Sequence, residues 1–344
     1  MGITNYIDYA PRFSNKEAVS ISKELYGIDV SVSPLPSERD QNFLLKEKKS
    51  REKYVLKISN QKEKKEVLDL QNSAMSRISS CLETFACPQI CRTKDKKKIA
   101  KIINQSGSFH YVRMITYIEG VPLGEVHPHT PELLQSVGEF IARIDQALTG
   151  FSHPAAQREF YWDLQRGLKT IKKFIKYIDN SNERSLIEYF LGKFQSQGVG
   201  LVSELEKSVI HNDGNDHNIL VRYKDQKSSS QKEVSGIIDF GDMVYSYTVG
   251  DIAVAAAYVM LGKEKFWNAA YHLIKGYNEV IKITDKEIEA ICHLIYLRLC
   301  MSVVISAFQK RQYPDNKYLS ISEKKAWVLL KKLKETTIHP LNLA

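Results

Sequence analysis

Two stretches decide how this chain folds: His211-Asn212-Asp213-Gly214-Asn215-Asp216-His217-Asn218 and Ile237-Ile238-Asp239-Phe240-Gly241-Asp242. The first places an Asp and an Asn five residues apart in a polar segment, and the second places another Asp at the end of an apolar strand. Phosphoryl transfer from a nucleotide requires such a set. One carboxylate orients or deprotonates the attacking hydroxyl, while an amide and a second carboxylate hold Mg²⁺ on the phosphates.

Asp213 is therefore the candidate catalytic residue, although Asp-Gly also commonly forms a simple turn. The presence of Asn218 and Asp239 favours the catalytic role. The amide oxygen of Asn218 suits Mg²⁺, a hard cation that prefers oxygen ligands, and Asp239 at a strand end is placed to bridge the metal to the phosphates. Asp242 is either close to the metal or an ordinary turn residue.

The composition is that of a soluble globular protein with one large core or two smaller ones, since 43% of the 344 residues are hydrophobic. No uninterrupted apolar run approaches the roughly 20 residues needed to span a bilayer, and the first residues do not resemble a secretory signal. The five cysteines are odd in number and irregularly spaced, which argues against a disulfide framework. We therefore expect a cytoplasmic location.

The formal net charge is +9, but the lysines are scattered in small groups along the chain. Most of these groups lie beside turn residues or on one face of an expected helix, which is typical of a solvated surface. No recognised nucleic-acid motif accompanies them. We expect neither a nucleic-acid nor a membrane partner.

The N-terminal part is predicted to be a small sheet with one crossing helix. A capping box at Ser14–Glu17 opens a first helix that ends near Gly27. Apolar stretches separated by polar breaks predict strands, and helical spacing of apolar residues predicts the crossing helix. The strands are expected at 28–35, 43–46, 54–58, 89–93, 99–104 and 111–118, and the helix at 61–82.

The rest of the chain is predicted to be mostly helical, with the boundary at Glu119-Gly120-Val121-Pro122. Two short strands, 219–223 and 234–239, are expected to flank a mobile hairpin loop at 224–232. The pattern indicates an α+β fold with two lobes, residues 1–118 and 119–344, and a nucleotide in the cleft between them. Helices are expected at 131–148, 157–178, 181–197, 248–261, 264–281, 285–309 and 321–336.

The expected strand at 54–58 contains a single cation, Lys57, among apolar residues. A buried Lys is costly unless it is paired, and nucleotide phosphates together with a carboxylate on the crossing helix are its natural partners. A surface position on an edge strand is the alternative. The loop 36–42, which joins the first two expected strands, lacks a glycine-rich pattern, but Ser37, Asn42 and backbone amides are candidates to cover phosphates.

The combined pattern resembles the aminoglycoside phosphotransferase and choline kinase superfamily, whose members share the protein-kinase-like fold. The usual loop of that superfamily is His-Gly-Asp with Asn five residues after the Asp; here Asn212 stands in place of the Gly. Within the superfamily the chain is most similar to the hydroxylysine kinase branch. The stretches that carry this are Ser37–Phe43, Phe151–Pro154 with Tyr161–Leu164, and Ile210–Asn218.

The resemblance implies Asp213 as catalytic base, Asn218 and Asp239 as Mg²⁺ ligands, Lys57 as phosphate anchor, and ATP or GTP as donor. It further implies that the nucleotide base meets backbone groups of Thr116, Tyr117 and Ile118. One departure concerns the acid on the crossing helix that pairs with the strand Lys in the family. The favoured helical register puts Gln71 there, with Glu66 and Asp69 as alternatives.

Four residues are candidates for the acceptor site: Trp162, Asp163, Arg298 and Asp242. Asp163 is suited to pair with a substrate ammonium and Trp162 to lie against it, although a core Trp beside a solvated Asp explains the pair equally well. Arg298 is suited to bind a substrate carboxylate, or to pair structurally with an acid such as Asp251. Asp251 itself is expected to cap the helix that follows it.

We therefore expect a kinase that phosphorylates a small hydroxylated amine such as hydroxylysine. An aminoglycoside phosphotransferase is the close alternative, although a net charge of +9 argues against binding polycations. A catalytically inactive nucleotide-binding protein is the alternative from a different class.

Overall fold

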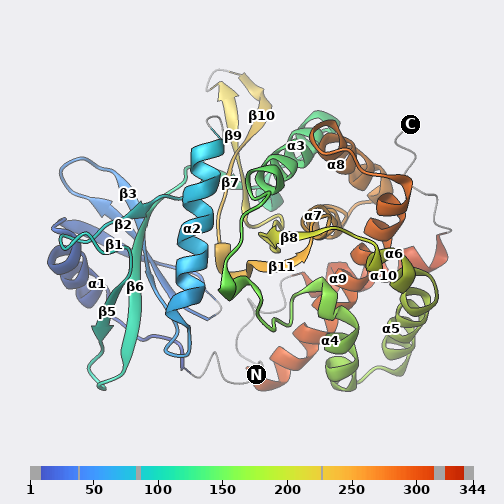
Figure 1. The fold of residues 1–344 in the computed structure, drawn as a ribbon, viewed down its shortest axis with the longest axis horizontal. Helices are drawn as coiled ribbons and strands as arrows, with labels where there is room; N and C mark the ends of the chain where they lie inside the picture. Colours follow the sequence, from blue (N-terminus) through green and yellow to red (C-terminus); the bar gives the residue numbers. More distant parts are fainter. Residues whose placement is uncertain (1–8, 38, 83–86, 226–227, 314–321, 337–344) are drawn as a thin grey trace. The chain divides into compact units, whose positions relative to one another are not determined.

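The computed structural model describes residues 9–37, 39–82, 87–225, 228–313 and 322–336. The chain divides into two compact units, residues 1–119 and 120–344. The division falls one residue after the boundary expected from the sequence. Each unit is described by itself (Figure 1).

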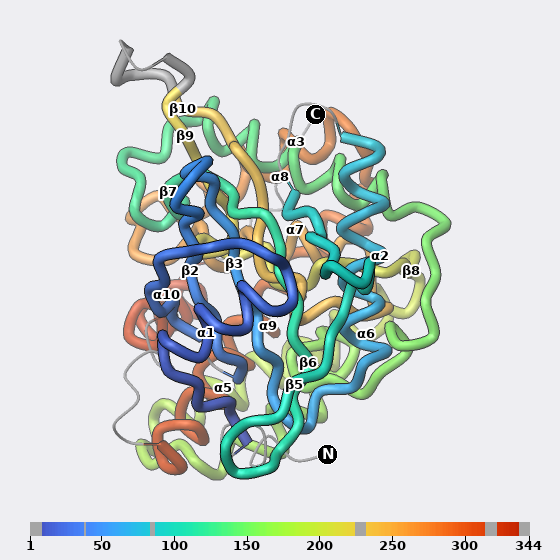
Figure 2. The backbone as a smooth tube through the Cα atoms, turned by 90° about the vertical axis from the view of Figure 1, so that its left-hand side faces the viewer, coloured from blue at the N-terminus to red at the C-terminus, as the bar shows by residue number. Residues whose placement is uncertain are grey.

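Unit 1 is built on an antiparallel sheet in the order β1-β2-β3-β6-β4, with β5 also pairing with β6; Figure 2 labels β2, β3, β6 and β5 of this sheet. All the strands and both helices of this unit lie where the sequence predicts them, with boundaries shifted by a few residues. The strands are β1 (Val30–Leu35), β2 (Gln41–Glu47), β3 (Lys53–Ile58), β4 (Ile90–Cys91), β5 (Ala100–Ile103) and β6 (Phe109–Thr116), and the helices are α1 (Asn15–Ile21, continued by a π-helical turn Ser22–Tyr26) and α2 (Lys65–Cys81).

The two faces of this sheet differ in chemistry. On one face, Leu56 of β3 pairs with Phe43 of β2 and with Met114 of β6. These three side chains share one apolar core with Ala18 and Ile21 of α1. The residues one step along each strand point to the opposite face. On that face Asn42, Lys57 and Arg113 lie in register, and α2 lies against it.

Unit 2 is mainly helical. Its helices are α3 (Pro131–Ala147), α4 (Gly167–Phe174), α5 (Ser181–Lys193), α6 (Val199–Ser203), α7 (Gly250–Val259), α8 (Phe266–Val280), α9 (Asp285–Gln312) and α10 (Glu323–Glu335). The predicted helix at 157–178 is wrong in its first half, because residues 157–163 are not helical and a 3-10 turn at Leu164–Arg166 leads directly into α4. The side chain of Asp163 accepts a hydrogen bond from the backbone N–H of Gln165, a local bond that favours a turn over a helix.

Two small sheets lie within unit 2. One has the order β10-β9-β7 and the other pairs β11 with β8. The predicted loop at 224–232 is wrong, because β9 continues to Asp225 and β10 begins at Ser228; residues 226–227 lie outside the described part. The strands are β7 (Val121–Pro122), β8 (Lys207–Ile210), β9 (Ile219–Asp225), β10 (Ser228–Ile237) and β11 (Val244–Tyr247).

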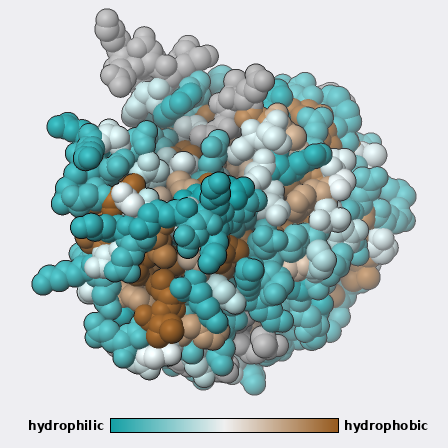
Figure 3. Space-filling model, turned by 60° about the vertical axis from the view of Figure 1, so that its left-hand side comes forward, coloured by the Kyte–Doolittle hydropathy of each residue, from teal (hydrophilic) through white to brown (hydrophobic). Residues whose placement is uncertain are grey.

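The long helix α9 is apolar enough to cross a membrane by length and composition, yet 89% of its apolar window is buried inside the protein. It is a core helix of unit 2. The face shown in Figure 3 is covered largely by hydrophilic residues with smaller hydrophobic areas between them, as is usual for a folded protein in water.

Candidate active site

Two sheet pairings bring the two decisive stretches of sequence together in unit 2. The loop 211–218 connects β8 to β9, and a 3-10 turn at Phe240–Asp242 connects β10 to β11. Ile210 pairs with Val244, and the backbone N–H of Ile238 donates to the carbonyl of Asn218 at 3.0 Å. The loop and the turn are therefore held side by side at the ends of paired strands.

Asp251 holds the start of the loop. It is buried, and its two carboxylate oxygens accept the backbone N–H groups of His211 at 2.8 Å and Asn212 at 2.5 Å. The prediction that Asp251 caps its own helix is wrong, because α7 begins one residue earlier and the carboxylate points back to the loop. Asn212 has a left-handed backbone (φ 65°), a conformation that Asn tolerates better than most residues. This explains how Asn replaces the usual Gly.

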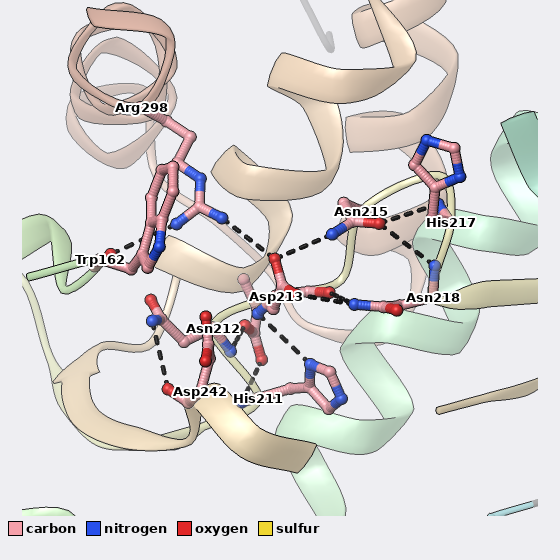
Figure 4. A network of polar contacts seen from close by, with 10 residues as sticks. Trp162, His211, Asn212, Asp213, Asn215, His217, Asn218, Asp242 and Arg298 are labelled. Atoms are coloured by element: carbon pink, nitrogen blue, oxygen red, sulfur yellow. Dashed lines mark hydrogen bonds and ion pairs between the residues drawn. The ribbon is translucent and has the colours of Figure 1, made fainter. Parts of the chain in front are cut away.

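The carboxylate of Asp213 is fixed by three side-chain donors (Figure 4). Its Oδ1 accepts from Arg298 Nη2 at 3.0 Å and from Asn215 Nδ2 at 2.9 Å, and its Oδ2 accepts from Asn218 Nδ2 at 2.7 Å. The side chain that supports the turn is that of Asn215 and not that of Asp213. Its Oδ1 accepts two backbone N–H groups of the loop. The Asp213 side chain is 21% exposed.

Burial raises the pKa of Asp213 well above its ordinary value, and the neighbouring Asp242 carboxylate raises it further, while the Arg298 guanidinium opposes both. Asp242 is buried and its backbone carbonyl accepts from Asn212 Nδ2 at 3.2 Å. It therefore lies next to the loop rather than in an ordinary surface turn. A carboxyl group with a raised pKa in a partly open position is suited to proton transfer.

Asn218 and Asp239 remain the candidate metal ligands. Asn218 donates through Nδ2 to Asp213, and its amide oxygen accepts no hydrogen bond from any residue in the described ranges. Asp239 is exposed and directly follows Ile238, whose backbone N–H is bonded to Asn218. Among the described residues, no group of three or more His, Cys, Asp or Glu side chains is placed to hold a metal. The pair fits Mg²⁺, which keeps few protein ligands and takes phosphate oxygens for the others.

The acceptor candidates take different positions. Asp163 is buried and its Oδ1 accepts from Ser246 Oγ at 2.6 Å, which argues against the prediction that it meets a substrate ammonium. Trp162 is half-buried, with its ring 4.4 Å from the guanidinium of Arg298. Arg298 pairs with Asp213 rather than with the suggested Asp251.

In unit 1, Lys57 lies on an interior strand, because β3 is paired with β2 on one side and β6 on the other. The edge-strand alternative is therefore excluded. Gln71 accepts a hydrogen bond from the buried Arg113, and Asn72 Oδ1 accepts another from it at 2.8 Å. Gln71 is thus the partner of Arg113 and not of Lys57. Within the described part of the chain, Lys57 makes no hydrogen bond or ion pair, which leaves its ammonium group for a ligand.

The remaining candidates of unit 1 are the other residues expected to bind the nucleotide. Asn42 belongs to β2 and is buried, and Ser37 is half-buried between β1 and β2. The N–H groups of Thr116 and Tyr117 donate to the carbonyls of Gln89 and Lys53. Of the three proposed base-binding residues, Ile118 is the one whose backbone N–H donates to no described residue.

Two residues that support the loop escaped the sequence analysis. Asp145 of α3 is buried, accepts from Tyr277 Oη at 2.8 Å, and has a pKa raised by burial and by the adjacent Asp251 carboxylate. The sequence does contain a signal for Asp145, since it is an acid on the apolar face of a predicted helix. The sequence contains no such signal for Asn215, because its hydrogen bonds depend on the conformation of the loop.

The comparisons with known proteins bear on the family and the fold of the chain. The profile of the phosphotransferase enzyme family matches residues 31–278. The chain is 32% identical to hydroxylysine kinase of Mus musculus over 94% of this chain and 90% of that protein. It is 30% identical to hydroxylysine kinase of Bos taurus with the same coverage.

Among solved structures, a microcompartment-associated aminopropanol kinase is similar with a TM-score of 0.72 and 14% identity, over 96% of this chain and all of that chain. Amicoumacin kinase, solved with AMP-PNP and Ca²⁺, has a TM-score of 0.70 and 15% identity, over 96% of each chain. These likenesses confirm the predicted protein-kinase-like α+β fold. The chain belongs to the phosphotransferase enzyme family.

Proposed function

We propose that this enzyme transfers the terminal phosphate of ATP or GTP to the hydroxyl group of hydroxylysine or a similar amine-bearing alcohol. The observation that carries the proposal is the partly exposed Asp213 carboxylate, held beside Asn218 in a chain that is 27–32% identical to hydroxylysine kinases over 94% of its length. The similarity of fold to an aminopropanol kinase supports an amine-bearing alcohol as acceptor.

In this proposal Asp213 orients the acceptor hydroxyl and takes its proton while the hydroxyl oxygen attacks the terminal phosphorus. The bond from that phosphorus to the bridging oxygen breaks, and the nucleoside diphosphate leaves. Asn218 and Asp239 would hold Mg²⁺, which neutralises charge on the phosphates when bound. Lys57 supplies a further cation for phosphate oxygens, consistent with its lack of a protein partner in the described ranges.

The donor is inferred from relatives. Amicoumacin kinase binds AMP-PNP with Ca²⁺, and an aminoglycoside 2'-phosphotransferase binds GDP. Both observations support a purine nucleotide donor, and the Ca²⁺ of amicoumacin kinase supports a divalent metal. The choice of ATP or GTP and of Mg²⁺ is part of the proposal.

We also infer that the enzyme works in the cytoplasm on small molecules. All five cysteines are free thiols, which suits a reducing compartment. The scattered lysines are typical of a solvated surface.

The test is a screen of hydroxylysine, ethanolamine, choline, homoserine and kanamycin with ATP and with GTP, followed as release of nucleoside diphosphate. The proposal expects the highest kcat/KM with hydroxylysine or another small amine-bearing alcohol, and turnover that stops when Mg²⁺ is chelated. Turnover with kanamycin alone would replace the proposal by antibiotic modification. No transfer to any small amine-bearing alcohol would reject it.

A further inference from the structure

Arg298 lies within 3.0 Å of the candidate catalytic carboxylate, although it comes from a distant part of the chain. It belongs to α9, its side chain is 2% exposed, and its Nη2 donates to Asp213 Oδ1. Its Nη1 donates to the backbone carbonyl of Trp162 at 3.3 Å. A buried cation is costly unless it is paired, so Arg298 and Asp213 depend on each other.

The donors around Asp213 are unevenly divided between its two oxygens. A carboxylate oxygen has room for about two hydrogen bonds. Oδ1 already accepts two, from Arg298 and Asn215, whereas Oδ2 accepts one, from Asn218. The remaining acceptor position therefore lies on Oδ2, the oxygen on the side of the candidate metal ligand.

We propose that Arg298 is a positioning residue that, together with Asn215, occupies Oδ1 of Asp213 and so directs Oδ2 at the acceptor hydroxyl. This rests on the proposed function, in which Asp213 receives the acceptor proton. The acceptor O–H bond breaks, its oxygen bonds to the terminal phosphorus, and the proton passes to Oδ2. Reactions of this kind require placement of the base to within a fraction of an ångström.

The surroundings of Arg298 restrict its movement. The Trp162 ring lies 4.4 Å and the Tyr258 ring 5.5 Å from the guanidinium carbon, and Figure 4 shows the guanidinium between Trp162 and Asp213. Because the guanidinium is planar, a ring on its face and two acceptors at its edge fix its plane. Lys would keep the charge and lose this geometry.

The experiment compares Arg298→Met with Arg311→Met, measuring kcat and KM for both substrates. Arg311 is a matched control, since it lies on the same helix, pairs with Asp179, and is near the ring of Tyr177. We expect Arg298→Met to lower kcat about 100-fold with the nucleotide KM unchanged. Arg311→Met is expected to keep the wild-type kcat. Methylguanidine added to Arg298→Met is expected to restore part of kcat, which a purely structural role would not produce.

A second route avoids a variant that fails to fold. Asn215→Asp keeps the Oδ1 acceptor for the N–H groups of His217 and Asn218 and replaces the Nδ2 donor to Asp213 by a carboxylate oxygen that repels Oδ1. We expect kcat at least about tenfold below wild type, and a similar loss in Arg298→Lys. If these two variants keep kcat within about threefold of wild type, the inference is overturned. If Asp213→Asn is also fully active, the proposed function itself fails; if only Asp213→Asn is inactive, the inference alone fails.

Discussion

Arg113 in unit 1 and Arg298 in unit 2 are both 2% exposed, but they bond to different partners. Arg113 donates to the amide oxygens of Gln71 and Asn72 on α2, so its charge is not cancelled by these contacts. Arg298 donates to the carboxyl group of Asp213, so its charge faces an acidic side chain. The loop of unit 2 therefore holds its buried Arg against an acidic side chain, whereas unit 1 holds its buried Arg against side-chain amides, next to Lys57 in the sheet register.

From this comparison we expect substitutions in the two regions to affect different measured quantities. Changes around the unit 2 loop should lower kcat, and the loss of Asp251 should lower stability as well. Changes around Arg113 should lower stability, and changes at Lys57 should weaken nucleotide binding.

The largest effect is expected from Asp251→Ala. The substitution leaves the buried N–H groups of His211 and Asn212 without their acceptor, which costs about 4 kcal/mol of unfolding free energy for the two groups. Urea denaturation measures this loss. A kcat per folded molecule equal to wild type would show that the loop keeps its shape without Asp251.

Arg113→Met is expected to lower the free energy of unfolding by about 3 kcal/mol, because two buried amide oxygens lose their donor. Lys57→Met is its matched control, since the two residues are neighbours in register. That variant should keep its melting temperature and raise the nucleotide KM about 30-fold, the equivalent of one charge-assisted hydrogen bond. The reverse pattern would contradict the division of roles between the two cations.

Asp145 should make the free energy of unfolding depend on pH. Its pKa is raised in the folded protein by burial and by Asp251, whereas in the unfolded chain it is about 3.9. Between these values the folded state binds more protons, so this group makes the free energy of unfolding fall as pH rises.

In Asp145→Asn that contribution disappears. The difference in unfolding free energy, wild type minus variant, should decrease by up to about 1.4 kcal/mol per pH unit within this window. Urea titrations at a series of pH values from about 5 to 7 measure it. Parallel pH profiles for the two proteins would disprove the raised pKa.

The smallest effect is expected from Asp163→Asn. Burial raises the pKa of Asp163, and Asn keeps an oxygen acceptor for Ser246. The change should alter stability by less than about 1 kcal/mol and leave the acceptor KM unchanged. A large rise in the acceptor KM would restore Asp163 as a ligand for the substrate ammonium.

The elements of unit 1 and the position of the loop 211–218 between two strands could be predicted from the sequence because both are encoded locally. Alternating apolar residues set the strands, and Asp213, Asn218 and Asp239 stand at fixed spacing beside them. The supports of the loop could not be predicted in this way. Arg298 lies 85 residues from its partner Asp213, and Asp251 was assigned to its own helix because a cap is the commoner use of an Asp at that position.

Similarly, the prediction of a helix before Gly167 was wrong. At Asp163 a hydrogen bond between the side chain and the backbone competes with helix formation. Gln71 was placed on the correct face of its helix, but its partner is Arg113. Helical register predicts which face a side chain lies on, and the strand opposite decides which residue it meets.

The most direct test of the account is the kcat of Asp213→Asn with its best acceptor, measured together with the melting temperature in the presence of Mg²⁺ and nucleotide. Asn keeps an oxygen for Arg298 and removes the base. We predict that kcat falls about 1000-fold while nucleotide still raises the melting temperature. Turnover close to that of wild type would contradict the assignment of Asp213 as the residue that receives the acceptor proton.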